Sequence, residues 1–176
     1  MDSDKGNKKN RMRNIPNAVT LINLSLGFLS LYLTMESMYY ESAYAIFGAM
    51  LLDGLDGRLA RRLKVTSEFG KELDSLADLV SFGVAPALLA YAMRLYIWGM
   101  RGVLLSIAFT LCGAFRLARF NVMNRQDSFI GVPITFCGPF LVLLLLLRKW
   151  IDFRAYPFIV VLLGYFMVCN LKVPKL

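Results

Sequence analysis

Six apolar segments of about 20 residues follow one another along the chain, and they restrict the folds open to it. They cover residues 17–35, 40–62, 71–94, 97–119, 131–149 and 155–172. A helix of about 20 residues spans the ~30 Å hydrocarbon core of a bilayer. Helices also satisfy their own backbone hydrogen bonds in lipid, and the segments lack the alternation of barrel strands. We therefore expect an all-α integral membrane protein with six transmembrane helices, forming one membrane domain over residues 1–176.

The composition agrees with a membrane protein and narrows the chemistry. Hydrophobic residues make up 57% and charged residues 18% of the 176 residues, which is too apolar for a soluble domain of this length. The net charge of +8 favours anionic partners such as membrane lipid headgroups and nucleotide phosphates, and we expect no nucleic-acid partner.

The chain has no histidine, and its three cysteines are scattered singly. Acid–base chemistry must therefore come from carboxylates or lysines, and neither a disulfide framework nor a zinc site is expected.

The distribution of basic residues predicts the orientation in the membrane. With a cytoplasmic N-terminus, fifteen of the 20 lysines and arginines fall on the inner side, including those of the basic segment 1–15 and of residues 58–71. The other five fall outside, three of them between residues 148 and 154. Because positive charge is retained on the cytoplasmic side, we predict a multi-pass protein of the cell membrane with both termini in the cytoplasm.

Four aspartates lie inside the apolar segments, where carboxylates are unfavourable. Asp53 and Asp56 belong to segment 40–62, and Asp74 and Asp78 belong to segment 71–94. If Arg62 marks the inner membrane surface, Asp53 lies roughly 13 Å deeper at a rise of about 1.5 Å per residue. One aspartate at the centre of a transmembrane helix costs ~2.5–3.5 kcal/mol, so four together cost on the order of 10 kcal/mol. A bound partner must offset this cost.

The spacing of the aspartates predicts a shared metal site. Asp53 and Asp56 are three residues apart and Asp74 and Asp78 are four apart, so each pair occupies one helical face. A short connection makes the two helices antiparallel neighbours whose acidic faces can converge. Carboxylates without histidine or thiolate ligands suit Mg²⁺ or Mn²⁺, with Ca²⁺ as an alternative. Two divalent ions would balance the four charges, and such a pair is a common clamp for displacement at phosphorus.

Small and basic residues around the aspartates favour a phosphate ligand. Gly57 and Ala60 continue the face of Asp53, and Gly70 precedes Asp74 by four residues, so a ligand or a helix can approach closely. Arg61 follows on the same face and can hold a phosphate with two hydrogen bonds. Helix packing by the glycines and membrane anchoring by the arginine are the alternative interpretations.

The residues from Asp53 to Asp78 resemble the signature of the CDP-alcohol phosphotransferase family. They read Asp53-Gly-Leu-Asp56-Gly57-Arg-Leu-Ala60-Arg61, then eight residues, Gly70, three residues, Asp74, three residues and Asp78. Members of that family cleave the pyrophosphate of a CDP-linked lipid or alcohol, transfer the phospho-alcohol half to a second alcohol and release CMP. The six-helix layout with an inside N-terminus is also similar to that family.

The resemblance implies roles for individual residues. The two metal ions would be held by Asp53, Asp56, Asp74 and Asp78, and Asp78 would also be the general base on the acceptor hydroxyl. The CDP pocket would be lined by Asp56, Gly57, Ala60, Arg61 and Gly70, together with Asn17 and Thr20 at the start of the first helix. The resemblance also implies a homodimer.

Further stretches resemble the branch of this family that transfers to L-serine. They are Asp78-Leu-Val-Ser-Phe-Gly-Val-Ala-Pro86, Phe115-Arg-Leu-Ala-Arg-Phe-Asn121 and Phe129-Ile-Gly-Val-Pro133. This resemblance implies transfer of a phosphatidyl group from CDP-diacylglycerol, or its archaeal analogue CDP-archaeol, to the serine hydroxyl. Serine also carries a carboxylate, and Arg116, Arg119 and Asn121 are the expected acceptor-binding residues. The two arginines share one helical face, so either can face the site, and membrane anchoring is the alternative for both.

Other functions share some of these features. A sibling enzyme would use glycerol 3-phosphate or an inositol phosphate, but such dianionic acceptors call for more basic residues than the fourth helix offers. A cation transporter would place polar residues through the full depth of the membrane, whereas the outer halves of the second and third helices are apolar. A packing scaffold without chemistry does not account for four intramembrane aspartates at matched spacing.

Overall fold

Helices make up nearly all of the described chain. The computed structural model describes residues 2–63, 68–122 and 131–169, and for residues 2–16 and 56–63 it describes the backbone alone. The elements are α1 (Asp2–Met35), α2 (Tyr39–Leu63), α3 (Glu68–Asp78), the π-helix η1 (Leu79–Val84), α4 (Ala85–Met93), the 3₁₀-helix η2 (Leu95–Trp98), α5 (Met100–Val122), α6 (Ile134–Leu146), the 3₁₀-helix η3 (Phe153–Ala155) and α7 (Tyr156–Val168). No strand occurs in these residues, which confirms the predicted all-α class.

The helices follow the six predicted apolar segments. The elements α3, η1 and α4 continue into one another as a single rod over Glu68–Met93. Three helical stretches are long and apolar enough to cross a membrane, namely Asn17–Met35, this rod and Met100–Val122. The apolar helices α6 and α7 are shorter, and α2 carries charged residues in its second half. The lengths therefore support a membrane protein, while the count of six spans stays a prediction.

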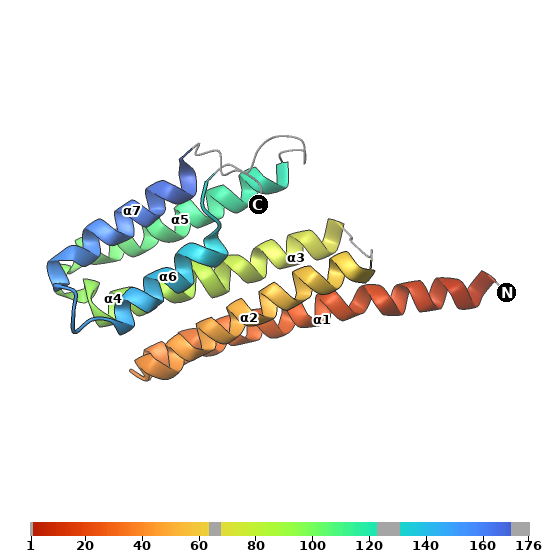
Figure 1. Ribbon diagram of the computed structural model, residues 1–176. Coiled ribbons are helices and arrows are strands. Elements are labelled where there is room, and N and C mark those ends of the chain that lie inside the picture. The colour runs from red at the N-terminus through yellow and green to blue at the C-terminus, as the bar shows by residue number, and fades with distance from the viewer. Residues whose placement is uncertain (1, 64–67, 123–130, 170–176) are drawn as a thin grey trace.

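The rod formed by α3, η1 and α4 occupies the middle of the bundle. Helices α1 and α2 form an antiparallel hairpin on one side of it, and α5 lies beside α7 on the other (Figure 1). Helix α6 packs against η1 and α4. The chain therefore surrounds residues 74–84 with neighbouring helices, and these residues include the second aspartate pair.

The outside of the bundle is apolar. Large side chains point outward on several helices, with exposed fractions of 68% for Phe28, 70% for Leu51 and 76% for Phe158. The interior instead contains many small residues, among them Ala43, Ala49, Ala77, Ala85 and Ala90. Small residues let helix backbones approach closely where lipid supplies no hydrophobic drive between helices. This distribution is typical of a protein whose solvent is lipid.

The π-helix η1 begins directly after Asp78. The backbone N–H of Ala85 donates to the carbonyl of Val80, five residues back. Pro86 follows, and in a regular α-helix its ring would crowd the carbonyl of Phe82, so a wider turn fits the sequence here. On α6, Gly138 packs directly on the backbone of Phe82, where a larger residue would collide with the carbonyl. The proline and this glycine explain why the helix widens just beyond the second aspartate pair.

A buried hydroxyl cluster joins the end of α1 to the start of α2. Ser42 Oγ lies 2.8 Å from Ser30 Oγ and 2.7 Å from Thr34 Oγ1. Ser42 also donates to the backbone carbonyl of Ser30 at 3.0 Å. All three residues are at most 4% exposed. Because these hydroxyls satisfy one another, the cluster fixes the hairpin at the end of the bundle that is remote from the aspartates.

Candidate metal centre and transfer site

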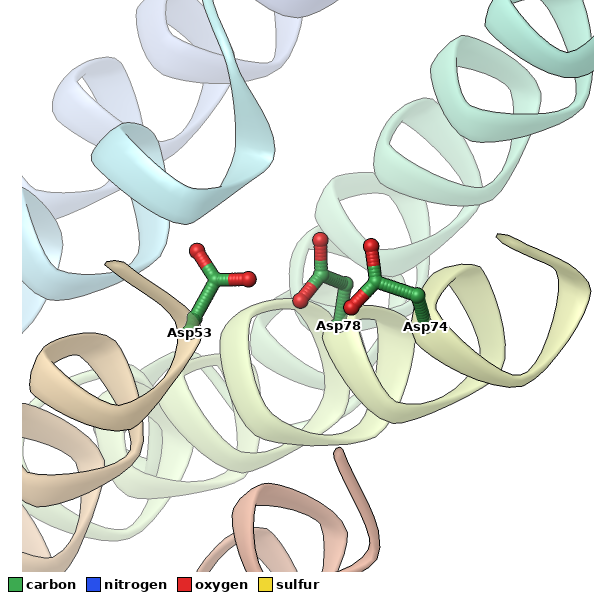
Figure 2. A group of neighbouring side chains, drawn as sticks. All are labelled: Asp53, Asp74 and Asp78. Atoms are coloured by element: carbon green, nitrogen blue, oxygen red, sulfur yellow. The ribbon is translucent and has the colours of Figure 1, made fainter. Parts of the chain in front are cut away.

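Three of the four predicted aspartates come together between α2 and α3. One carboxylate oxygen from each of Asp53, Asp74 and Asp78 lies within 4.8 Å of the other two. Figure 2 shows Asp53 reaching in from α2, while Asp74 and Asp78 project from successive turns of α3 toward the same side. The antiparallel packing and the four-residue spacing on α3 produce this convergence, as the sequence predicted.

Burial makes this cluster costly without a cation or a shared proton. Asp78 is only 7% exposed, and Asp53 and Asp74 are half-buried. The carboxyl groups of Asp53 and Asp78 are close enough to share a hydrogen bond. Carboxylates at such distances cannot all stay ionised in an apolar environment unless a positive charge lies among them.

The donor set fits a hard divalent cation. Oxygens on opposite sides of an ion with bonds of ~2.0–2.6 Å lie roughly 4–5 Å apart, which matches the 4.8 Å span of the three carboxylates. Oxygen-only ligands favour Mg²⁺, Mn²⁺ or Ca²⁺ over softer metals. The described residues therefore can close around one ion with little rearrangement.

Several predicted residues of the second helix fall outside the described side chains. They are Asp56, Gly57, Ala60 and Arg61, for which the structure gives the helical backbone of α2 alone. Their position one to two turns beyond Asp53 continues the same helix toward the α2–α3 connection. Their proposed roles in metal and CDP binding stay predictions.

The remaining residues of the predicted CDP pocket lie on α1 and α3. Thr20 is buried at 5% exposure, and Asn17 and Gly70 are half-buried. Asn17 and Thr20 lie near the middle of α1 and not at its start as predicted, because this helix begins at Asp2. Helix α1 packs along α3. This packing is compatible with a nucleotide pocket formed by both.

Arg116 of α5 lies close to the carboxylates. Its guanidinium is near enough to Asp78 for their charges to interact, and its Nε is buried without a hydrogen-bond acceptor among the described residues. The guanidinium carbon lies 6.0 Å from the centre of the Phe120 ring. The guanidinium is therefore partly buried within electrostatic reach of Asp78, and its Nε–H has donor capacity to spare.

Asn121 connects the end of α5 to α3. Its Nδ2 donates to Ser75 Oγ at 3.0 Å and to the Glu72 carboxylate at 3.3 Å. Ser75 follows Asp74 directly, so these bonds fix α5 against the acidic turn of α3. The sequence analysis singled out Asn121 but missed Ser75 and Glu72, because no motif marks a partner that lies 46 residues away. The adjacent segment 123–130, which includes Phe129, lies outside the described residues.

A partly desolvated cation site beside a guanidinium can bind an anionic substrate, polarise a phosphate and accept a proton. Comparisons with known proteins point to the same chemistry. The family model of CDP-alcohol phosphatidyltransferases matches residues 13–170. This match spans the aspartate motif and every element from the middle of α1 to the end of α7.

Several relatives carry one name. A Helicobacter pylori protein named CDP-diacylglycerol–serine O-phosphatidyltransferase is 40% identical over 169 residues, covering 91% of this chain and 71% of that protein. Proteins with the same name are 38% identical in Bacillus subtilis, covering 93% of this chain and 91% of that protein. In Methanocaldococcus jannaschii the identity is 37%, covering 92% of this chain and 74% of that protein.

Proposed function

The chain belongs to the CDP-alcohol phosphatidyltransferase family, and we propose that it is a phosphatidylserine synthase. It transfers the phosphatidyl group from CDP-diacylglycerol, or CDP-archaeol, to the hydroxyl of L-serine and releases CMP. The single observation that carries the choice of serine is the name shared by relatives that are 37–40% identical over nearly the whole chain. The position of Arg116 beside the carboxylates supports it independently, because serine brings a carboxylate that needs a cation.

The four aspartates hold two divalent ions, Mg²⁺ or Mn²⁺ with Ca²⁺ as an alternative. Asp53, Asp74 and Asp78 contribute the converged oxygens, and Asp56 adds the fourth carboxylate from the same helix as Asp53. When bound, the ions supply charge stabilisation for the pyrophosphate and its leaving group. The four carboxylates would hold the ions, because their charges balance those of two divalent cations.

Asp78 is the general base. It accepts the proton of the serine hydroxyl as the serine oxygen forms a bond to the lipid-side phosphorus. The bond from that phosphorus to the CMP oxygen breaks, and CMP departs with the bonding electrons. The burial of Asp78 at 7% exposure supports this role, because bulk water has little access to its carboxylate.

The CDP portion lies along α1, the second half of α2 and the start of α3. The residues proposed to contact it are Asp56, Gly57, Ala60, Arg61, Gly70, Asn17 and Thr20. The small residues leave room for the pyrophosphate, and Arg61 neutralises it. The packing of α1 on α3 supports a pocket shared by these elements.

Arg116 binds the serine carboxylate, with Arg119 and Asn121 at the rim of the acceptor site. Arg116 interacts electrostatically with Asp78, so a serine whose hydroxyl meets Asp78 would place its carboxylate near this guanidinium. Asn121 already bonds to Glu72 and Ser75. Its contribution to the acceptor would therefore come through the position of α5 as well as through direct contact.

The enzyme spans the cell membrane six times, with both termini and the active site on the cytoplasmic side. The excess of basic residues at the aspartate end of the helices supports this orientation. The same charge favours contact with anionic lipids. Family resemblance favours a homodimer.

Release of CMP tests the activity. Purified full-length protein is incubated with CDP-diacylglycerol and, in separate reactions, L-serine, glycerol 3-phosphate or an inositol phosphate. We expect CMP release with serine that exceeds the other acceptors by at least tenfold in kcat/KM. Preference for a phosphorylated acceptor would assign the chain to a sibling enzyme of the same family, and no CMP release with any acceptor would contradict the transferase.

A further inference from the structure

Two arginines meet at the end of the bundle remote from the aspartates. Arg94 follows α4, and Arg148 follows α6. The Nη2 of Arg94 donates to the backbone carbonyl of Arg148 at 3.0 Å, although the two residues are 54 positions apart. Arg94 comes about 16 residues after Asp78 on one helical rod, which places it roughly 24 Å away at a rise of about 1.5 Å per residue. The pair therefore lies near the opposite surface of a bilayer.

Tyrosine rings hold both guanidiniums in place. Arg94 lies 5.6 Å from the centre of the Tyr156 ring, and Arg148 lies 5.6 Å from the centre of the Tyr40 ring. Arg148 Nη2 also donates to Tyr40 Oη at 3.3 Å. Both arginines act electrostatically on the phenol of Tyr156. Two positive charges at the ends of α4 and α6 are thus held by tyrosines of α7 and α2.

The described groups around this pair accept hydrogen bonds from the arginines but supply no counter-charge. Among the described side chains, which belong to residues 17–55, 68–122 and 131–169, no carboxylate lies within ion-pair distance of Arg94 or Arg148. Arg94 Nε is buried without an acceptor among the described residues, and so is the indole N–H of Trp98, four residues further on. Guanidinium and indole groups can only donate. A ligand that satisfies the Nε–H of Arg94 must offer an acceptor, and the two positive charges favour an anion.

We infer that Arg94 and Arg148 form a binding site for a phosphate group, supplied by an anionic phospholipid of the leaflet opposite the aspartates. Two guanidiniums in fixed positions match the oxygens of a phosphodiester. The surrounding tyrosines and tryptophans are the residues typical of the membrane–water interface, where lipid phosphates lie. The inference is independent of the proposed transferase activity, because none of these residues belongs to the transfer site.

The chain contains its own reporter for this site. Its two tryptophans, Trp98 and Trp150, both lie in the connections at this end. The full-length protein is reconstituted in bilayers that mix phosphatidylcholine with brominated phosphatidylglycerol, which quenches tryptophan on contact. The quenching curve gives the preference for phosphatidylglycerol over phosphatidylcholine. We expect a preference of roughly tenfold or more, lost in the double variant Arg94→Gln/Arg148→Gln.

Control variants separate the site from general charge. Arg101→Gln removes one exposed positive charge at the same end and should leave the preference unchanged. Arg148→Lys keeps the charge but loses the paired donors, so the preference for phosphatidylglycerol should drop several-fold. This milder variant tests the site even if the double variant fails to fold. CMP release on the aspartate side should be unaffected in folded variants.

Added inorganic phosphate distinguishes the two sources of the ligand. If the preference persists in excess phosphate, the lipid is the ligand. If phosphate alone shifts tryptophan emission in the wild type but not in the double variant, and abolishes the lipid preference, the lipid assignment is overturned in favour of a soluble anion. A wild type with no preference for phosphatidylglycerol and no response to phosphate would overturn the site altogether.

Discussion

The two ends of this helix bundle differ in the buried polar groups that they contain and in how those groups are partnered. At the aspartate end, like charges from α2 and α3 are brought within 4.8 Å of one another, an arrangement that is unfavourable until a cation enters. At the other end of the α1–α2 hairpin, the hydroxyls of Ser30, Thr34 and Ser42 satisfy one another completely. The difference teaches that carboxylates gathered by helix packing mark the place proposed for chemistry, while hydroxyls that bond across α1 and α2 hold these helices together.

The two ends also differ in how regular their long helices are. The acidic turn of α3 is followed at once by the widened turn η1 and is held by Asn121 from α5. Departures from regular α-helix of this kind occur often at functional sites. The α1–α2 hairpin instead continues as regular helix through its hydroxyl cluster. The widened turn within the rod of α3, η1 and α4 thus lies directly beside the carboxylates, whereas the 3₁₀-helices η2 and η3 lie in connections at the other end.

Removal of metal is the strongest test of this contrast. We expect that an excess of chelator abolishes CMP release and that Mg²⁺ or Mn²⁺ restores it, because the clustered carboxylates cannot stay ionised together without divalent charge. The measurement is the initial rate of CMP release after dialysis against chelator. Helical content by circular dichroism should remain, since the hydroxyl cluster needs no ion. Full activity in excess chelator would remove the basis for a metal centre.

Asp78→Asn separates the base from the binding site. The change keeps the side-chain volume and removes the proton acceptor, so kcat should fall by ~10²–10⁴ while binding of the CDP-lipid largely persists. Asp56→Asn serves as the comparison and should weaken both metal and nucleotide binding. Single-turnover kinetics combined with CDP-lipid binding would detect the split. A normal kcat in Asp78→Asn would mean that another group, such as Asp74, removes the proton.

Arg116→Gln tests whether Arg116 binds the carboxylate of the serine acceptor. Loss of a charge-assisted hydrogen bond to a carboxylate costs ~1.5–3 kcal/mol, so the KM for serine should rise roughly 10–150-fold. The affinity for the CDP-lipid should change little. Arg119→Gln is the matched control from the same helix, with the same loss of charge, and should have the smaller effect on KM. Equal KM values in the wild type and both variants would leave these arginines as membrane anchors.

Much of the fold and part of the site could be predicted from the sequence, because lipid imposes strong local rules. Apolar length alone gave the helical segments, and residue spacing alone gave the convergence of Asp53 with Asp74 and Asp78. The electrostatic interaction of Arg116 with Asp78 could not be predicted, since Arg116 and Arg119 share one helical face and the choice depends on how α5 packs. Pro86 hints at the widened turn η1, but the close packing of Gly138 on Phe82 involves α6, which no local pattern reveals. The contact of Arg94 with Arg148 likewise depends on tertiary packing.

The smallest expected effect comes from the end that we interpret as structural. Ser42→Ala removes the shared hydroxyl that contacts both Ser30 and Thr34. The buried Ser30 hydroxyl then loses its partner, whereas Thr34 Oγ1 keeps its bond to the Ser30 carbonyl. Such bonds between membrane helices contribute modestly, so we expect unfolding to become easier by about 1–2 kcal/mol. Denaturant unfolding in mixed micelles measures this change. Ser25→Ala is the control, because Ser25 is exposed and bonds only within its own helix, and it should change stability far less.

Since the cluster lies away from the carboxylates, kcat and the KM for serine should stay at wild-type values in Ser42→Ala at temperatures where the variant is folded. A selective loss of kcat with unchanged stability would contradict the division between the two ends, because the hydroxyl cluster would then take part in catalysis.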